Sequence, residues 1–154
     1  MKILTAEQTQ AWDKFTADHE NLKPGDLMNR AAQAFVRWFT NIYADSNRPV
    51  WIICGTGNNG GDGLAIARYL HAKFYSVRIF VGNFSKKYSP DFDIQLKNLP
   101  PRGSVPLVWM EGGSSLPKIP PEVVLIDAIF GAGLNRPLEG NWQILAHHIN
   151  NLPN

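Results

Sequence analysis

The chain begins with two stretches in which apolar residues recur at helical spacing. Residues 5–19 open with Thr5 followed by Gln8, the pattern of a capping box, and then carry Trp12 and Phe15 at helical spacing. After Pro24-Gly25, apolar side chains return every three or four residues, at Leu27, Met28, Ala31, Ala32, Phe35, Val36 and Phe39. The pattern predicts two helices, the second with a wide apolar face, before any strand.

From Pro49 onward the pattern alternates between short apolar runs and helical periodicity. The runs at 50–54, 77–82, 106–110 and 123–127 have strand length, and the first is apolar throughout. Helical patterns lie between and after them at 60–74, 89–99 and 141–151, with Leu64, Ala67, His71 and Phe74 on one inward stripe of the first. Strands that alternate with helices predict a parallel, doubly wound α/β sheet.

Composition narrows the class of protein. A chain of 154 residues with 44% apolar content predicts one domain, in which we expect the five tryptophans at core positions. The 15 basic and 13 acidic residues are scattered, which argues against a nucleic-acid partner. The single cysteine, Cys54, predicts a buried small side chain without a disulfide or zinc site. The sequence shows neither a secretory signal nor a membrane-length segment, so we expect a soluble, cytoplasmic protein.

Two glycine-rich loops follow predicted strands. GTGNNGGDG, residues 55–63, comes directly after the first strand, and DAIFGAGLNRP, residues 127–137, comes at the end of the fourth. The carboxyl ends of parallel strands meet at one edge of the sheet, where ligands of such folds bind. The sequence therefore predicts that the two loops form one ligand site.

The first loop satisfies G-x-G-x-x-G, and a helix that begins near Gly60 would offer free N–H groups to a phosphate. Conventional NAD binding also requires an acidic residue about twenty positions later, at the end of the second strand, for the ribose. Asn83 stands near that position, which disfavours an ordinary cofactor site. A P-loop is excluded because no Lys-Ser or Lys-Thr follows the glycines.

Acidic and amide side chains in the loops raise a second possibility. A carboxylate at Asp62, in the first turn of the predicted helix, would repel a phosphate unless a cation offset its charge. Oxygens of Asn58, Asn59, Asp62 and Asp127 are ligands suited to such an ion. Alternatively, Asp62 only starts the helix and Asn58-Asn59 form a left-handed turn. Arg136 could bind a second phosphate or could be a surface arginine that caps the loop.

Four motifs carry a family resemblance: TAEQTQAWD, DLMNRAAQA, GTGNNGGDGLAIARYL and LIDAIFGAGLNRPLEG. Over essentially all of residues 1–154 the chain resembles the NAD(P)H-hydrate epimerases, the YjeF N-terminal domain family. The resemblance implies one three-layer α/β/α Rossmann-like domain, with a mostly parallel sheet preceded by two helices, that forms homodimers. It also implies an isomerase that interconverts the R and S forms of hydrated NADH and NADPH. A dehydratase specific for the S form completes the repair, and in many bacteria it is fused to this domain.

The resemblance also implies roles for individual residues. Asn59 and Asp127 would ligate a potassium ion, and Asp62 is a candidate for the acid-base group that epimerisation needs. The residues that would line the substrate are Asn58, Asn59, Gly60, Gly61 and Asp62 on one wall and Gly131, Ala132, Gly133, Leu134, Asn135, Arg136 and Pro137, near its phosphates, on the other.

The sequence departs from the family pattern at its carboxyl end. The family continues after the last helix into a further strand with a Ser-x-Asp-x-Pro-Ser-Gly type of motif, which contributes to the substrate and potassium sites. This sequence ends before such a motif, so we expect the C-terminal part of the domain to be missing. The alternative function is a noncatalytic nucleotide-binding or scaffold module of the same fold, as in an mRNA-decapping scaffold.

Overall fold

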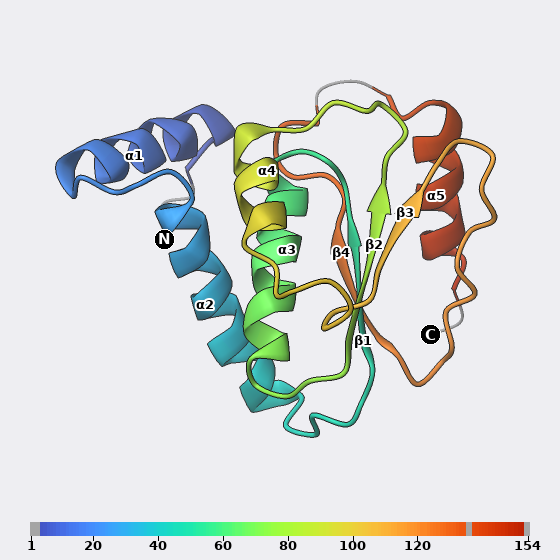
Figure 1. Ribbon diagram of the computed structural model, residues 1–154. Coiled ribbons are helices and arrows are strands. Elements are labelled where there is room, and N and C mark those ends of the chain that lie inside the picture. Colours follow the sequence, from blue (N-terminus) through green and yellow to red (C-terminus); the bar gives the residue numbers. More distant parts are fainter. Residues whose placement is uncertain (1–3, 135–136, 153–154) are drawn as a thin grey trace.

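A four-stranded parallel sheet forms the centre of the computed structural model, which describes residues 4–134 and 137–152 (Figure 1). The strands are β1 (Val50–Cys54), β2 (Val77–Gly82), β3 (Leu107–Met110) and β4 (Val124–Ala128). Their order in the sheet is β3-β2-β1-β4, and Val50 of β1 pairs with Val77 of β2 and with Val124 of β4. The predicted parallel sheet is confirmed, with its glycine-rich loops at one edge.

Helices cover both faces of this sheet. α2 (Asp26–Ile42), α3 (Asn58–His71) and α4 (Pro90–Lys97) pack on one face, and α5 (Gly140–Asn150) covers the other (Figure 1). α1 (Ala6–His19) lies apart from these layers, near the edge at which the strands end. The predicted three-layer α/β/α arrangement with two leading helices is therefore confirmed.

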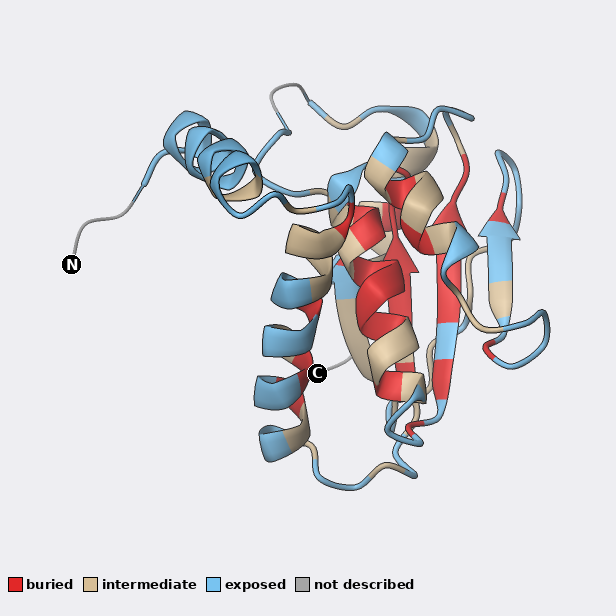
Figure 2. Cartoon of the chain, turned by 60° about the vertical axis from the view of Figure 1, so that its left-hand side comes forward, coloured by how far each residue is buried: buried red, intermediate tan, exposed pale blue. Residues whose placement is uncertain are grey.

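The core has two parts because the sheet is buried on both faces. The larger part joins β1 and β2 to the helices α2, α3 and α4, and Figure 2 shows how much of α3 it buries. Leu64 and Leu70 of α3 are fully buried there. The smaller part lies under α5 and consists of Ile53, Phe80, Met110, Ile129 and Leu145. Cys54 is fully buried, as the sequence predicts, and burial raises the pKa of its thiol.

Glycines in the first loop allow the start of α3 to pack closely against the carboxyl ends of β1 and β4. A Cβ atom on Gly60 would collide with the carbonyl oxygen of Gly55, and one on Gly63 would lie 2.7 Å from both the Sγ atom of Cys54 and the Cβ atom of Ala128. None of the loop's glycines has a positive φ angle. These glycines are therefore required for close approach rather than for an unusual backbone conformation.

The bounds of α3 differ from the prediction at both ends. The helix begins at Asn58 rather than Gly60 and ends at His71 rather than Phe74. Phe74 has a φ angle of 65° and is 89% exposed, so its predicted inward position is wrong. The Tyr75 N–H donates to the Leu70 carbonyl at 3.1 Å, and this turn buries Tyr75 in place of Phe74.

α1 forms as predicted but does not join the core. The hydroxyl of Thr5 accepts from the Gln8 N–H and the Gln8 side chain accepts from the Thr5 N–H, which completes the capping box. No residue of α1 is buried, and Trp12 and Phe15 are 64% and 66% exposed. Trp38 and Trp109 are also exposed, so the predicted core positions of three of the five tryptophans are wrong.

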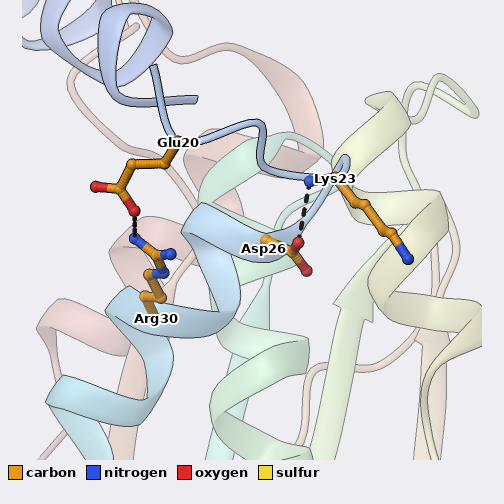
Figure 3. Close-up of polar contacts among 4 residues, drawn as sticks. All are labelled: Glu20, Lys23, Asp26 and Arg30. Atoms are coloured by element: carbon orange, nitrogen blue, oxygen red, sulfur yellow. Dashed lines mark hydrogen bonds and ion pairs between the residues drawn. The ribbon is translucent and has the colours of Figure 1, made fainter. Parts of the chain in front are cut away.

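Polar contacts hold the connection between α1 and α2. Arg30 of α2 forms an ion pair with Glu20, and the backbone N–H of Lys23 donates to the Asp26 carboxylate at 3.0 Å (Figure 3). Both side chains of the ion pair are exposed, and such pairs typically contribute about 0–1 kcal/mol. α1 is therefore held mainly by its connection and not by apolar burial.

No helix among the described residues combines the length and the apolar character needed to cross a lipid bilayer.

The packing of α3 makes a prediction about stability. Gly63→Ala should lower the free energy of unfolding by about 1–2 kcal/mol, because overpacking against two buried neighbours outweighs the helix propensity of alanine. Gly133→Ala is the matched control, since a Cβ there meets no atom within 4 Å, and its effect should stay within about 0.5 kcal/mol. Urea unfolding measures both changes. Equal stabilities of the two variants would contradict the packing argument.

Candidate functional site

A large cleft opens where the two glycine-rich loops meet. Its volume is about 1270 Å³, and its walls come from residues 55–59 with Asp62, from residues 129–134 and 137–139, and from the first turns of α1. Leu4, Ser85 and Trp142 complete the lining. The cleft lies beyond the carboxyl ends of β1 and β4, as parallel-sheet geometry predicts.

The amino end of α3 forms one wall of the cleft. Gly57 is the N-cap, and the first α-helical hydrogen bond runs from the Gly61 N–H to the Gly57 carbonyl at 3.0 Å. The N–H groups of Asn58, Asn59 and Gly60 precede this bond, so the helix supplies no acceptors for them. Together with the positive end of the helix dipole they suit an anion such as a phosphate.

The second loop faces the first across the cleft. The Gly55 N–H donates to the Ala128 carbonyl at 3.0 Å, which joins the bases of the two loops. Farther out, a Cβ atom on Gly131 would lie 3.8 Å from the Oδ1 atom of Asn59. Residues 131–134 are exposed. The two loops therefore meet as predicted and leave an open face for a ligand.

Asp62 is the titratable group of the cleft with a strongly perturbed pKa. Its pKa is raised from the ordinary 3.8 to about 6, first by burial and then by the nearby charges of Asp91 on α4 and Asp13 on α1. Because α3 begins at Asn58, Asp62 lies in the second turn, so its predicted place in the first turn is wrong. Its carboxyl group can donate and accept a proton near neutral pH.

Asp127 lies at the same sheet edge but does not line the cleft. Its position on β4 pairs with Ile53 of β1, and its carboxylate accepts the Ile129 N–H at 2.9 Å. Asn59 does line the cleft. Within residues 4–134 and 137–152, no group of three or more His, Cys, Asp or Glu side chains could hold a metal ion.

The cleft brings together most of the residues predicted for substrate binding. Those that line it are Asn58, Asn59, Asp62, Gly131, Ala132, Gly133, Leu134 and Pro137. Gly60 and Gly61 are buried beneath the wall and do not line it. Asn135 and Arg136 lie outside the described residues. The alternative of a left-handed Asn58-Asn59 turn is wrong, because both residues are helical.

Asn83, near the position where a conventional NAD site would have an acid, has a structural role. It is only 8% exposed, its amide donates to Glu111 at 2.7 Å, and its oxygen accepts from the Tyr88 hydroxyl at 2.8 Å. These bonds join the segments that follow β2 and β3. Asn83 therefore fixes the ends of two strands.

Sequence reasoning missed the wall that α1 supplies. Thr9, Gln10 and Asp13 line the cleft, although the sequence motif suggested only a leading helix. A polar helical stripe normally faces solvent, so the residues alone gave no sign that it faces a cleft.

Comparison with known proteins agrees with this geometry. A crystal structure of a yeast protein, ynu0 (YNL200c), matches 99% of this chain and 68% of its own, with a TM-score of 0.79 and 23% sequence identity, and so shows the same fold. A protein of Oenococcus oeni named NAD(P)H-hydrate epimerase is 33% identical over 150 residues, which cover 97% of this chain and 69% of that protein. A Dictyoglomus turgidum protein named bifunctional NAD(P)H-hydrate repair enzyme Nnr is 32% identical, and the match covers 99% of this chain and 29% of that protein.

The family model described as YjeF-related protein N-terminus matches residues 24–154. That match includes both glycine-rich loops and every strand of the sheet. The chain therefore belongs to the YjeF-related protein N-terminus family.

Proposed function

We propose that this protein interconverts the R and S epimers of hydrated NADH and NADPH, as an isomerase of nicotinamide nucleotide repair. One observation carries the proposal: the free amino end of α3 and the raised-pKa carboxyl of Asp62 share a single cleft. The first suits a pyrophosphate and the second suits acid-base chemistry. Relatives that cover nearly the whole chain have NAD(P)H-hydrate epimerase or repair enzyme in their names.

In this proposal the phosphates bind between the two loops. The N–H groups at the start of α3 approach them from one side, and the exposed loop 131–134 approaches from the other. Asp62 lies one helical turn farther along α3, so the hydrated ring extends toward it. The pyrophosphate and the reactive ring of the substrate thereby occupy separate parts of the cleft.

Epimerisation needs one group that first donates a proton as an acid and then accepts a proton as a base. The hydrated ring carries a hydroxyl on a carbon next to nitrogen. Asp62 donates its proton to this hydroxyl, the C–O bond breaks with loss of water, and the nitrogen lone pair forms a C=N⁺ bond. Water then adds to the other face and returns a proton to the Asp62 carboxylate. The alternative route, ring opening and closure, requires the same kind of proton transfer.

A potassium ion fits the chemistry of the residues predicted to hold it. Asn59 and Asp127 offer hard oxygen ligands near the carboxyl ends of β1 and β4, and only one Asp127 oxygen is used by Ile129. We propose that these two residues contribute to such a site. A bound cation would supply positive charge near the phosphates and the carboxylates.

The partner of the enzyme would be an S-specific dehydratase, and the name of the Dictyoglomus turgidum relative describes a bifunctional protein. The homodimer and the cytoplasmic location stay predictions from the sequence.

The competing function is a noncatalytic nucleotide-binding or scaffold module. Turnover separates the two functions, because a scaffold would bind nucleotide without accelerating epimerisation.

The first test is repair of the R epimer. Purified protein is mixed with hydrated NADH enriched in the R form, together with an active S-specific dehydratase, and regeneration of NADH is followed by its absorbance. We expect NADH to form faster than with the dehydratase alone. Binding of hydrated NADH without any acceleration would favour the scaffold function.

Asp62→Asn tests the acid-base assignment. We expect kcat/KM to fall about 100-fold, since a positioned acid-base group contributes about 10²–10⁴-fold. In the wild-type protein, kcat/KM should decline as the pH rises above about 6, because Asp62 then loses the proton that it donates. Burial and the charges of Asp91 and Asp13 set this pKa. The variant should lack this decline. Glu122→Gln, an exposed change outside the cleft, is the control. Unchanged turnover in Asp62→Asn would exclude Asp62.

The same variant makes a separate prediction about stability. The pKa of Asp62 is higher in the folded protein than in the unfolded chain, so its proton contributes stability below about pH 4 that is lost as the pH rises through about 6. Asp62→Asn should therefore be more stable than the wild type at pH 8, by about 1 kcal/mol after allowance for partial exposure, and equally stable at pH 4. Urea unfolding at both pH values measures this difference. A variant that is less stable at pH 8 would contradict it.

A further inference from the structure

α1 presents a polar stripe to the cleft. Ala6, Thr9, Gln10 and Asp13 all line it, and their spacing of three, four and seven residues places them on one face of the helix. Trp12 and Phe15 point in other directions and are 64% and 66% exposed. The helix therefore turns polar groups toward the cleft and aromatic groups away from it, the reverse of a helix that packs on a core.

Two members of the stripe are available to a ligand. Within the described chain, the side-chain hydrogen bonds and ion pairs of the α1 segment involve Thr5, Gln8, Thr9, Lys14 and Asp18. The Thr9 hydroxyl donates to the Thr5 carbonyl at 3.0 Å. Gln10 and Asp13 have no such partner, so an amide and a carboxylate remain free at the cleft wall.

Asp13 also lies near the reactive end of the cleft. Its charge is one of those that raise the pKa of Asp62, which requires the two carboxyl groups to be near each other. A second carboxylate, Asp91, acts on Asp62 from α4. This region is negative, whereas the phosphate site one turn away lies at the positive end of α3.

We infer that α1 forms a third wall of the substrate site, in which Gln10 and Asp13 contact the hydrated nicotinamide ring rather than the phosphates. This inference rests on the proposed function. The ring carries a hydroxyl and a carboxamide NH₂, which donate hydrogen bonds, and the Asp13 carboxylate accepts them. The Gln10 amide both donates and accepts, which suits the carboxamide. A phosphate in the same place would be repelled by Asp13 and Asp62.

The same carboxylate also affects the chemical step. When the C–O bond of the ring breaks, the ring nitrogen gains positive charge, and a carboxylate beside it stabilises that charge more than it stabilises the neutral ground state. Removal of the Asp13 charge should therefore lower kcat, whereas removal of the whole carboxyl group should also weaken binding. Removal of the Gln10 amide should act mainly on binding.

The test separates the ring from the rest of the nucleotide. ADP-ribose contains the pyrophosphate and both riboses but no nicotinamide ring. Calorimetry therefore measures the Kd of ADP-ribose and of hydrated NADH for the wild type, Asp13→Ala, Asp13→Asn and Gln10→Ala. We expect Asp13→Ala and Gln10→Ala to weaken hydrated NADH about tenfold and ADP-ribose less than twofold. Asp13→Asn should keep most of the affinity but lower kcat about tenfold.

Glu7→Gln is the matched control, because Glu7 lies on the same helix but does not line the cleft. It should change neither Kd nor kcat by more than twofold. All variants should unfold at the wild-type temperature, since α1 buries no residue. Equal losses for both ligands, or no loss for either, would overturn the inference, as would a wild type that binds hydrated NADH no more tightly than ADP-ribose. Ring-dependent binding without epimerisation would refute the proposed function and leave α1 as a ligand wall.

Discussion

The close packing of α3 on the end of the sheet is the constraint on which the site depends. Gly60 lies against the Gly55 carbonyl, and Gly63 lies against the side chains of Cys54 and Ala128, so α3 approaches β1 and β4 more closely than residues with a Cβ atom would allow. This approach places Asn58 and Asn59, whose N–H groups have no acceptors within the helix, on the wall of the cleft. Larger residues would move the helix outward and separate these donors from the second loop.

The same packing sets the electrostatics of the cleft. The amino end of α3 is a positive region for an anion, and Asp62 follows in the next turn, where partial burial disfavours its charge. Two further carboxylates, Asp13 and Asp91, come from other helices. One helix thus presents opposite electrostatic preferences about one turn apart, which suits a nucleotide with phosphates at its centre and a reactive ring at its end.

α1 has a different physical basis from the other helices. Its capping box stabilises it locally, and its connection to α2, which the Glu20–Arg30 pair spans, holds it in place, whereas α3 is held by the core. A helix without buried residues can form part of a ligand site at little cost to the stability of the sheet. Its exposed Trp12 and Phe15 show that its apolar side chains do not determine its orientation within this chain.

Much of the fold follows from local pattern. The apolar runs 50–54 and 77–82 coincide with β1 and β2, because short apolar segments bounded by loops leave few other structures. The cap at Thr5 forms as predicted, and Ser89 caps α4 in a similar way, since caps depend on residues within one turn. The meeting of the two glycine-rich loops was also predictable, because parallel strands end at the same edge.

Other features depended on contacts between distant segments. The Asn-Asn-Gly-Gly sequence has low helix propensity, so its helical start at Asn58 reflects packing on the sheet edge. Phe74 is exposed and Tyr75 is buried, contrary to the prediction for Phe74, because the chain turns after α3 toward β2. The sequence by itself determined the order of elements and the residues of both loops, which need only short-range patterns. Tertiary structure alone decided the pKa of Asp62 and the wall formed by Gln10 and Asp13, because both depend on where α1 and α4 are placed relative to the start of α3.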